Sequence, residues 1–367
     1  MVTVKISKIQ ALMLGISSVT VTGHLFYIPV IIYYAGRDSW ISLLLATIPA
    51  ILIGFTISFL AQRFKGQTLV EYSQLILGKW AGKLLAIIFL GYFFHEITLD
   101  IRGFGEFYTS AITPQTPILI YMTAIFIMAV YAVRSGLEVL ARTNQAFLLF
   151  LIPIGVLASI LTQKDKDYKN FLPVMNNGWD SILLGTLSIT AVYCSIFVLS
   201  MILSDVSSAK HLKKYTVMAM VIQTAMFIGP VTGVIAVFGE ERAVGMYFPT
   251  FQLLRDIEIG TLERLDVIGV LLWSLGSFAK VSLLLYALAV GVAQLFKIDD
   301  YTIFVLPIAA LIVIVSFLNS EDFIGIYRFE RDIYPYYSTL VGLVLPLILL
   351  IVSLFRKNIS PIKGEHH

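Results

Sequence analysis

The sequence predicts an all-α membrane protein with ten transmembrane helices, arranged as a five-plus-five inverted repeat in which helices 1 and 6 are broken. Three observations carry this prediction: an apolar composition, ten membrane-length apolar segments, and short motifs that recur in the two halves. Hydrophobic residues make up 58% of the 367 residues and charged residues 13%, and the mean hydropathy is +0.87. Soluble domains carry about 25% charged residues, so we expect residues 1–367 to form a single integral membrane domain.

A transmembrane helix needs about 20 predominantly apolar residues. The first apolar run is too long for a signal-peptide core and lacks a small-residue cleavage site after it, so we interpret it as a retained span. We expect the first repeat over about 9–162, and the second over about 180–319 with a tenth helix at 334–355. The expected spans are 9–35, 40–62, 84–109, 117–134, 138–162, 180–204, 215–238, 267–295, 301–319 and 334–355.

Two further segments show helical periodicity without the length and composition of a span. The segment "TLVEYSQLILGKWAGK" places Leu69, Tyr72 and Ile76 on one face, which predicts an interfacial amphipathic helix anchored by Trp80. The segment "FPTFQLLRDIEIGTLERLD", before the eighth span, has a similar pattern.

The distribution of basic residues predicts the orientation. With the N-terminus inside, 15 of the 26 Lys and Arg residues lie in inside segments, 9 lie outside and 2 lie within spans. Cytoplasmic loops carry the excess of Lys and Arg in membrane proteins. We therefore expect both termini in the cytoplasm.

Two short motifs occur once in each half of the chain. Gly15–Thr20 reads G-I-S-S-V-T and Gly185–Thr190 reads G-T-L-S-I-T, at a constant offset of 170. Leu90–His95 reads L-G-Y-F-F-H and Leu275–Lys280 reads L-G-S-F-A-K. These motifs fall on spans 1 and 6 and on spans 3 and 8, which a five-plus-five repeat pairs. The alternative is that small residues in these spans only allow close helix packing.

The first pair of motifs lies where a membrane helix is weak. Ser and Thr hydroxyls satisfy backbone groups that a break exposes, and Gly permits the turn. An unwound segment at Thr20–Gly23 would offer free amides to a carboxylate, and one at Thr190–Ser195 would offer carbonyls to an ammonium group. The two breaks together predict a zwitterionic ligand, an amino acid. The predicted ligand-binding residues are Thr20, Val21, Thr22, Gly23, His24, Tyr92, Glu96, Thr190, Tyr193, Cys194, Ser195 and Gly276.

Charged residues inside the expected spans indicate a second function for the same region. An ionised group at this depth is costly, so it faces a partner or water. A cation or proton relay, or a contact with the ligand, is one interpretation, and a buried pair that only fixes packing, such as Lys280–Glu96 or Arg102–Glu106, is the other. The predicted ion- or proton-coupling residues are Glu96, Asp100, Glu106 and Lys280.

Several classes of function lack support in the sequence. No P-loop, H-E-x-x-H or G-x-S-x-G motif occurs, so we expect no enzyme activity. Cys194 is the single cysteine, which excludes an internal disulfide and a cysteine metal cluster. We expect neither a cofactor nor a metal, and the net charge of +3 gives no indication of nucleic-acid binding. The final His366 and His367 are assigned no function.

Motifs along essentially the whole chain resemble the B subunit of the nutrient germinant receptors of endospore-forming bacteria. This is the spore germination permease family, within the amino acid–polyamine–organocation transporter superfamily. The motifs are "LVEYSQLILGKWAGK", "RGFGEF", "YAVRSGLEVLAR", "NFLPVMNNGW", "YFPTFQLLRDIEIGTLERLD" and "LLWSLGSFAKVSLLLYALAVGVAQLF".

The resemblance implies the LeuT-like ten-helix transporter fold, with a ligand pocket between helices 1, 3, 6 and 8. It also implies the inner membrane of the spore as location, an A subunit and a lipoprotein C subunit as partners, and germination triggered by a nutrient such as an amino acid. Relatives often have a Gly-Ser-like pair in the first break, where this chain has Thr20–Gly23. They often have Gly followed by Glu in the sixth span, where this chain has Cys194 and Ser195. These departures leave the ligand and the coupling ion open.

Three functions are therefore carried forward. The first is a germinant-binding receptor subunit with a permease fold. The second is a proton- or cation-coupled amino acid transporter, and the third is a passive ion or water conduit or a structural subunit.

Overall fold

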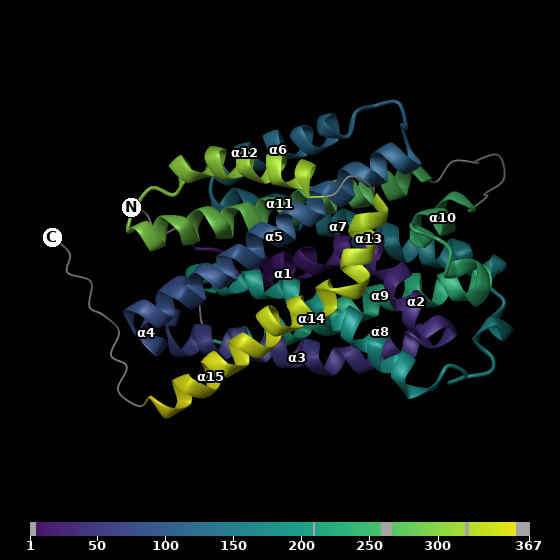
Figure 1. Ribbon diagram of the computed structural model, residues 1–367, viewed down its shortest axis with the longest axis horizontal. Helices are drawn as coiled ribbons and strands as arrows, with labels where there is room; N and C mark the ends of the chain where they lie inside the picture. The colour runs from purple at the N-terminus through teal and green to yellow at the C-terminus, as the bar shows by residue number, and fades with distance from the viewer. Residues whose placement is uncertain (1–4, 208–209, 258–265, 320–322, 357–367) are drawn as a thin grey trace.

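The computed structural model describes residues 5–207, 210–257, 266–319 and 323–356, and these residues form a bundle of long helices that run mostly along one axis (Figure 1). The α-helices are α1 (Lys8–Thr22), α2 (Ile28–Ala35), α3 (Ser39–Arg63), α4 (Leu69–Leu77), α5 (Lys79–Ala111), α6 (Ile118–Arg134), α7 (Leu137–Leu161), α8 (Gly178–Tyr193), α9 (Leu212–Ala243), α10 (Pro249–Arg255), α11 (Asp266–Phe296), α12 (Thr302–Leu318), α13 (Phe323–Asp332), α14 (Tyr334–Thr339) and α15 (Leu345–Phe355).

Every expected span coincides with helix in the described ranges. By length and composition, seven helical stretches are able to cross a membrane, or eight when α12 and α13 are counted as one span. One of the seven, Lys8–Arg63, is 56 residues long and contains the first two expected spans. The fourth expected span is the shorter apolar helix α6, with 17 residues. The all-α membrane architecture is confirmed.

The first span is interrupted where the sequence predicts, directly after Thr22. Residues Gly23–Tyr27 form a turn of π-helix between α1 and α2, and Pro29 follows at the start of α2. The chain does not unwind: Gly23 has helical φ and ψ of −59° and −49°, and the Ile28 N–H bonds to the Gly23 carbonyl. The expected free amides at Thr20–Gly23 are therefore wrong, because the wider π turn keeps backbone groups paired within the helix.

The sixth span changes its helix type at the position that the repeat predicts. α8 ends at Tyr193, and Cys194–Met201 continue as a 3₁₀-helix, here called η5. Thr190 lies within α8, so the expected unwinding at Thr190–Ser195 is a tightening of the helix instead. η5 is entirely buried and packs against α1 and α3, which places this irregular backbone in the centre of the bundle.

The two short amphipathic segments are only partly as predicted. α4 buries Leu69, Tyr72 and Ile76, as its periodicity indicates. Gly78, at φ +89°, ends α4, so Trp80 lies at the start of α5 with 82% of its surface exposed. The second segment forms α10 at Pro249–Arg255, and its continuation over 258–265 lies outside the described residues.

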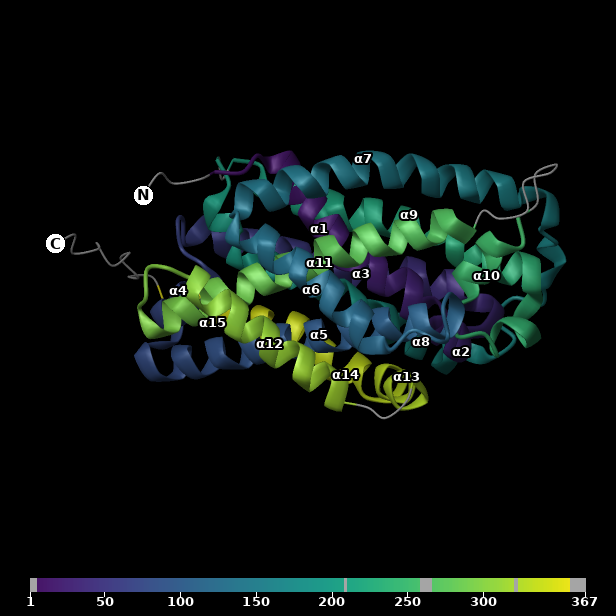
Figure 2. The same ribbon diagram turned by 90° about the horizontal axis from the view of Figure 1, so that it is seen from above.

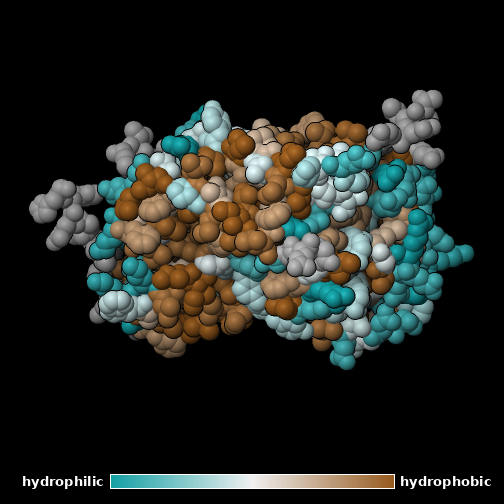
Figure 3. Space-filling model, turned by 45° about the horizontal axis from the view of Figure 1, so that its top comes forward, coloured by the Kyte–Doolittle hydropathy of each residue, from teal (hydrophilic) through white to brown (hydrophobic). Residues whose placement is uncertain are grey.

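The centre of the bundle contains α1, which packs against α7, α9, α11 and η5. Figure 2 shows α7 along one edge, with α9 and α1 beside it. Apolar side chains cover much of the left and centre of the face shown in Figure 3, whereas most of the hydrophilic ones on that face gather toward the right-hand end. An apolar outer face of this kind is typical of a protein that lies in lipid.

Candidate ligand and ion site

A buried polar cluster surrounds the ammonium group of Lys280 on α11. Its Nζ lies 2.9 Å from Oε1 of Glu96 and 2.9 Å from Oδ2 of Asp100. It also donates hydrogen bonds to Thr22 Oγ1 at 2.6 Å and to Ser195 Oγ at 3.4 Å. We call these five residues the Lys280 cluster. They bring together α1, α5, η5 and α11, which contain spans 1, 3, 6 and 8.

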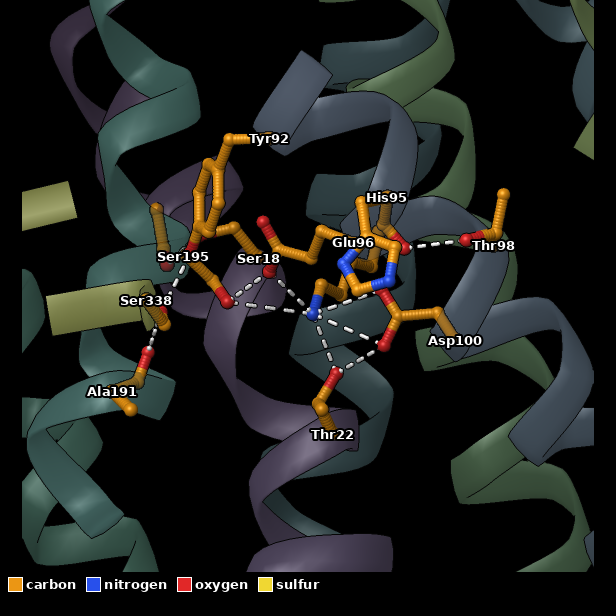
Figure 4. A network of polar contacts seen from close by, with 12 residues as sticks. Ser18, Thr22, Tyr92, His95, Glu96, Thr98, Asp100, Ala191, Ser195 and Ser338 are labelled. Atoms are coloured by element: carbon orange, nitrogen blue, oxygen red, sulfur yellow. Dashed lines mark hydrogen bonds and ion pairs between the residues drawn. The ribbon is translucent and has the colours of Figure 1, made fainter. Parts of the chain in front are cut away.

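The irregular segments position the two hydroxyl groups of the cluster. Thr22 is the last residue of α1, and its hydroxyl donates to Asp100 Oδ1 at 2.7 Å. Ser195 is the second residue of η5 and donates to Glu96. Glu96 and Asp100 are four residues apart on α5, which places both carboxylates on one helix face. Figure 4 shows the four side chains converging on one point.

The cluster contains two carboxylates and one ammonium group, all at most 8% exposed. Charges removed from water are stable only when they are paired and hydrogen-bonded. The hydroxyls of Thr22 and Ser195 supply further polar contacts to Lys280 and to the carboxylates, but Oε2 of Glu96 has no hydrogen-bond partner in the described structure. The arrangement can therefore hold an additional positive charge or proton.

Both alternative ion pairs that the sequence predicts are present. Arg102 contacts Glu106 at 2.6 Å, and its guanidinium group also donates to the Phe317 carbonyl at 3.0 Å. Glu106 therefore lies in a separate pair, six residues beyond Asp100 on α5, and the structure does not bring it into the Lys280 cluster.

A second set of hydrogen bonds lies next to the cluster and connects spans 3, 6 and 10, which are formed by α5, α8 and α14 at this point. The Tyr92 hydroxyl lies 2.9 Å from the Ser338 hydroxyl on α14. Ser338 in turn donates to the Ala191 carbonyl at 2.9 Å. Cys194 is buried against Gly342, where a side chain would come within 2.4 Å of the Cys194 Cβ atom. These contacts make Tyr92 and Cys194 neighbours of the cluster and not members of it.

The remaining predicted ligand residues face elsewhere. Thr20, Val21, His24 and Gly276 line a cavity on another side of α1. Gly23 packs against the ring of Phe227. Tyr193 lies 2.9 Å from the Thr224 hydroxyl, and Thr190 donates to the Thr186 carbonyl at 2.8 Å. Gly23, His24 and Tyr193 all lie against the ring of Phe227 and not against Lys280.

Glu330 and Gln223 are among the buried polar residues that the sequence does not indicate. Glu330 on α13 is 2% exposed, and its Oε2 has no hydrogen-bond partner among the described residues. Glu330 precedes the tenth span, and from the sequence a glutamate at this position would be expected to lie in a solvated loop. Gln223 on α9 is fully buried and accepts from the Thr20 hydroxyl at 3.0 Å. An amide within a span is the signal that would have identified it. Within the described ranges, no group of three His, Cys, Asp or Glu side chains is placed to hold a metal ion.

The fold and the charged centre define a transporter-like integral membrane protein. Residues 5–324 match the family model described as spore germination protein, the spore permease family. The chain belongs to this family, and the resemblance seen in its motifs is confirmed.

Relatives and a solved structure agree with this assignment. The chain is 29% identical over 330 residues to spore germination protein KB of Bacillus subtilis, covering 88% of each protein. It is 23% identical over 353 residues to spore germination protein XB of Bacillus anthracis, covering 95% of this chain and 98% of the relative. The structure of MhsT in complex with L-phenylalanine superposes with a TM-score of 0.68 at 15% identity, covering 95% of this chain and 98% of MhsT. The LeuT-like transporter fold is thereby confirmed.

Proposed function

We propose that this protein is the permease-like subunit of a spore nutrient receptor, in which binding of a small nutrient at the Lys280 cluster triggers germination. Membership of the spore germination protein family supports the role. The observation that carries the proposed site is the convergence of Thr22, Glu96, Asp100 and Ser195 on Lys280 (Figure 4). Four helices from both halves of the chain meet there, so a ligand that enters the cluster changes the contacts between them.

The chemistry of the cluster supports an amino acid as the nutrient. A ligand carboxylate would pair with the Lys280 ammonium group, and a ligand ammonium group would pair with Glu96 or Asp100. A zwitterion thus replaces the internal ion pairs with pairs of its own, so the buried charges stay compensated. The solved neighbour MhsT holds L-phenylalanine in its structure, which supports the same ligand class.

The receptor assembly belongs to the same proposal. We propose an A subunit and a lipoprotein C subunit as partners, the spore inner membrane as location and cytoplasmic termini. The names of the relatives, which are spore germination proteins of Bacillus species, support the location. The excess of Lys and Arg in inside segments supports the orientation.

A thermal-shift screen of amino acids, sugars and nucleosides on the purified protein tests the ligand, because a ligand that binds only the folded state stabilises it by mass action. Ser195→Ala removes a hydroxyl that contacts Glu96 and Lys280, and it should reduce the ligand-induced shift. Ser353→Ala is the matched control, since Ser353 is fully buried on α15 and bonds only to the Leu350 carbonyl in the described structure. Equal shifts in both variants, together with unchanged germination of Ser195→Ala spores, would contradict the proposal.

A proton- or cation-coupled amino acid transporter is the second candidate. The observation that favours it is the excess of carboxylate over ammonium in the Lys280 cluster, which can take up one positive charge. Uptake of labelled amino acid into proteoliposomes, measured with and without an imposed proton gradient, separates the two functions. Concentrative uptake that depends on the gradient supports transport. A protein that binds ligand but gives no uptake supports sensing alone.

A further inference from the structure

A cavity of about 400 Å³ lies beside α1, separate from the Lys280 cluster. It is bounded by α1, the π turn Gly23–Tyr27, α7, α9, α10 and α11. Thr20 and His24 line it, whereas Thr22 contacts Lys280. Because successive helical residues are about 100° apart, residues two positions apart point in nearly opposite directions. Helix α1 therefore separates an ionic site on one face from this cavity on the other.

The lining is apolar and carries no carboxylate, ammonium or guanidinium group. No Asp, Glu, Lys or Arg is among the described residues that line it. Apolar side chains such as Leu151, Met226 and Trp273 form most of the wall, and the polar contribution comes from a few hydroxyl groups and His24. Burying a charge without a partner is costly, so the chemistry of this cavity selects an uncharged ligand. The volume falls within the range of small-molecule sites, about 300–1,000 Å³.

His24, one of the residues that line the cavity, carries a buried polar atom without a partner in the described part of the chain. The Nε2 atom of His24 is buried and has no hydrogen-bond partner among the described residues. The backbone of His24 is fixed, because its carbonyl accepts from the Thr250 hydroxyl at 3.2 Å. Its ring contacts the ring of Phe227 at 4.8 Å between centroids. A buried nitrogen without a partner costs free energy that a hydrogen bond from a ligand would recover.

The cavity reaches the lateral surface between α7 and α9. Val156 and Ile160 on α7 are 55% and 60% exposed, and Ile228 on α9 is 39% exposed, although all three line the cavity. Both helices are apolar enough to span a membrane, so we expect this opening to face the acyl chains of the bilayer. A lipophilic molecule dissolved in the bilayer can enter by this route without crossing the charged centre.

We propose that this cavity binds a small uncharged molecule that has an apolar body and one hydroxyl or carbonyl group, with that group directed at the imidazole of His24. The cavity also borders the Lys280 cluster through α1 and α11. Gly276 lines it one helix turn before Lys280, and a Cβ atom at Gly276 would come within 2.0 Å of a Val21 methyl group. A molecule in the cavity therefore lies next to the contact between α1 and α11, the two helices that supply Thr22 and Lys280 to the cluster.

Photolabelling of the full chain in nanodiscs with a diazirine-bearing alkanol tests this site. Labels mapped by mass spectrometry should concentrate on cavity residues such as Leu151 and Met226. Unlabelled octanol should compete, and octylammonium and octanoate should not. His24→Phe should weaken competition by octanol about tenfold, equivalent to about 1.4 kcal/mol. Labelling spread evenly over the apolar surface, or equal competition by the charged analogues, would overturn the proposal.

A pair of glycine variants makes the test specific. Gly155 lines the cavity, is exposed on α7, and a Cβ atom there would meet nothing within 4 Å, so Gly155→Leu adds an apolar side chain beside the opening from a Cβ position that is free of clashes. Gly91 on α5 is equally open and exposed but does not line the cavity. Gly155→Leu should suppress cavity labelling and Gly91→Leu should retain it; equal labelling would contradict the site.

A phospholipid acyl chain shares the apolar chemistry of the proposed ligand, so a second probe separates the two sources. A phospholipid with a diazirine in its acyl chain is incorporated into the same nanodiscs. If this lipid labels the cavity residues and octanol does not reduce its labelling, the cavity is a lipid-chain groove and the small-molecule proposal fails. Labelling by the alkanol alone supports the proposal.

Discussion

Lys280 on α11 and Glu96 on α5 form an ion pair of 2.9 Å in which neither side chain is more than 2% exposed. The pair joins the third and eighth spans, which correspond in the two predicted repeats. Asp100 lies at the same distance from the same ammonium group. One lysine thus compensates two carboxylates, and removing it leaves both without their cation.

Lys280→Met should lower the free energy of unfolding by about 3–5 kcal/mol, because breaking a buried ion pair leaves an uncompensated charge. The measurement is thermal or denaturant unfolding of the purified protein in detergent. Lys214→Met is the control, since Lys214 is exposed on α9. Adding Glu96→Gln to Lys280→Met should recover part of the loss. If the single variant is as stable as the native protein, the cluster does not hold these charges together.

Gly23→Ala should destabilise the protein by about 1–3 kcal/mol, as expected of overpacking in a buried site. A Cβ atom at this position would lie 2.0 Å from Cζ of Phe227, whose ring is fully buried. Phe227→Leu in the same chain should relieve the overlap and restore part of the stability. A drop in melting temperature for Gly23→Ala that the second substitution leaves unchanged would show that the contact with Phe227 is not its cause.

Gly82→Ala should be at least as damaging, because the obstacle is backbone and cannot rotate away. A Cβ atom at Gly82 would come within 2.3 Å of the Gln74 Cα atom and 2.4 Å of the Ser73 carbonyl oxygen. We expect the contact between α4 and α5 to open, with faster proteolysis around Gly78, the residue that joins them. Gly91→Ala on the same helix meets open space and should behave like the native protein. Equal proteolysis of the two variants would argue against this packing.

Asp205→Asn should stabilise the protein at pH 7.5 and have little effect near pH 4. Partial burial raises the pKa of Asp205, which lies beyond the sixth span, to about 6 from an ordinary value of 3.8. The protonated form is favoured in the folded state, so its stabilising contribution is present at low pH and is lost as pH rises through about 6. Melting temperatures of both proteins between pH 4 and 8 should converge at the acidic end. Parallel curves would contradict the raised pKa.

The sequence alone determined the helices and the elements that carry the site. Membrane-length apolar segments are local properties, so the spans could be read directly from the chain. Charges are rare within spans because lipid penalises them, which singled out Glu96, Asp100 and Lys280. The recurring motifs located the irregular segments that supply Thr22 and Ser195.

Tertiary structure decided how these side chains are grouped. Which face of α1 meets Lys280 depends on how four helices pack, so Thr22 joins the cluster while Thr20 and His24 face the cavity. Glu106 bonds to Arg102 one turn away, and Glu330 becomes buried although it lies outside the spans. The residue types also left the geometry of the two helix interruptions undetermined. Lipid requires that backbone N–H and C=O groups be paired. A π turn and a 3₁₀ segment keep those groups within a helix, which the residue types by themselves do not specify.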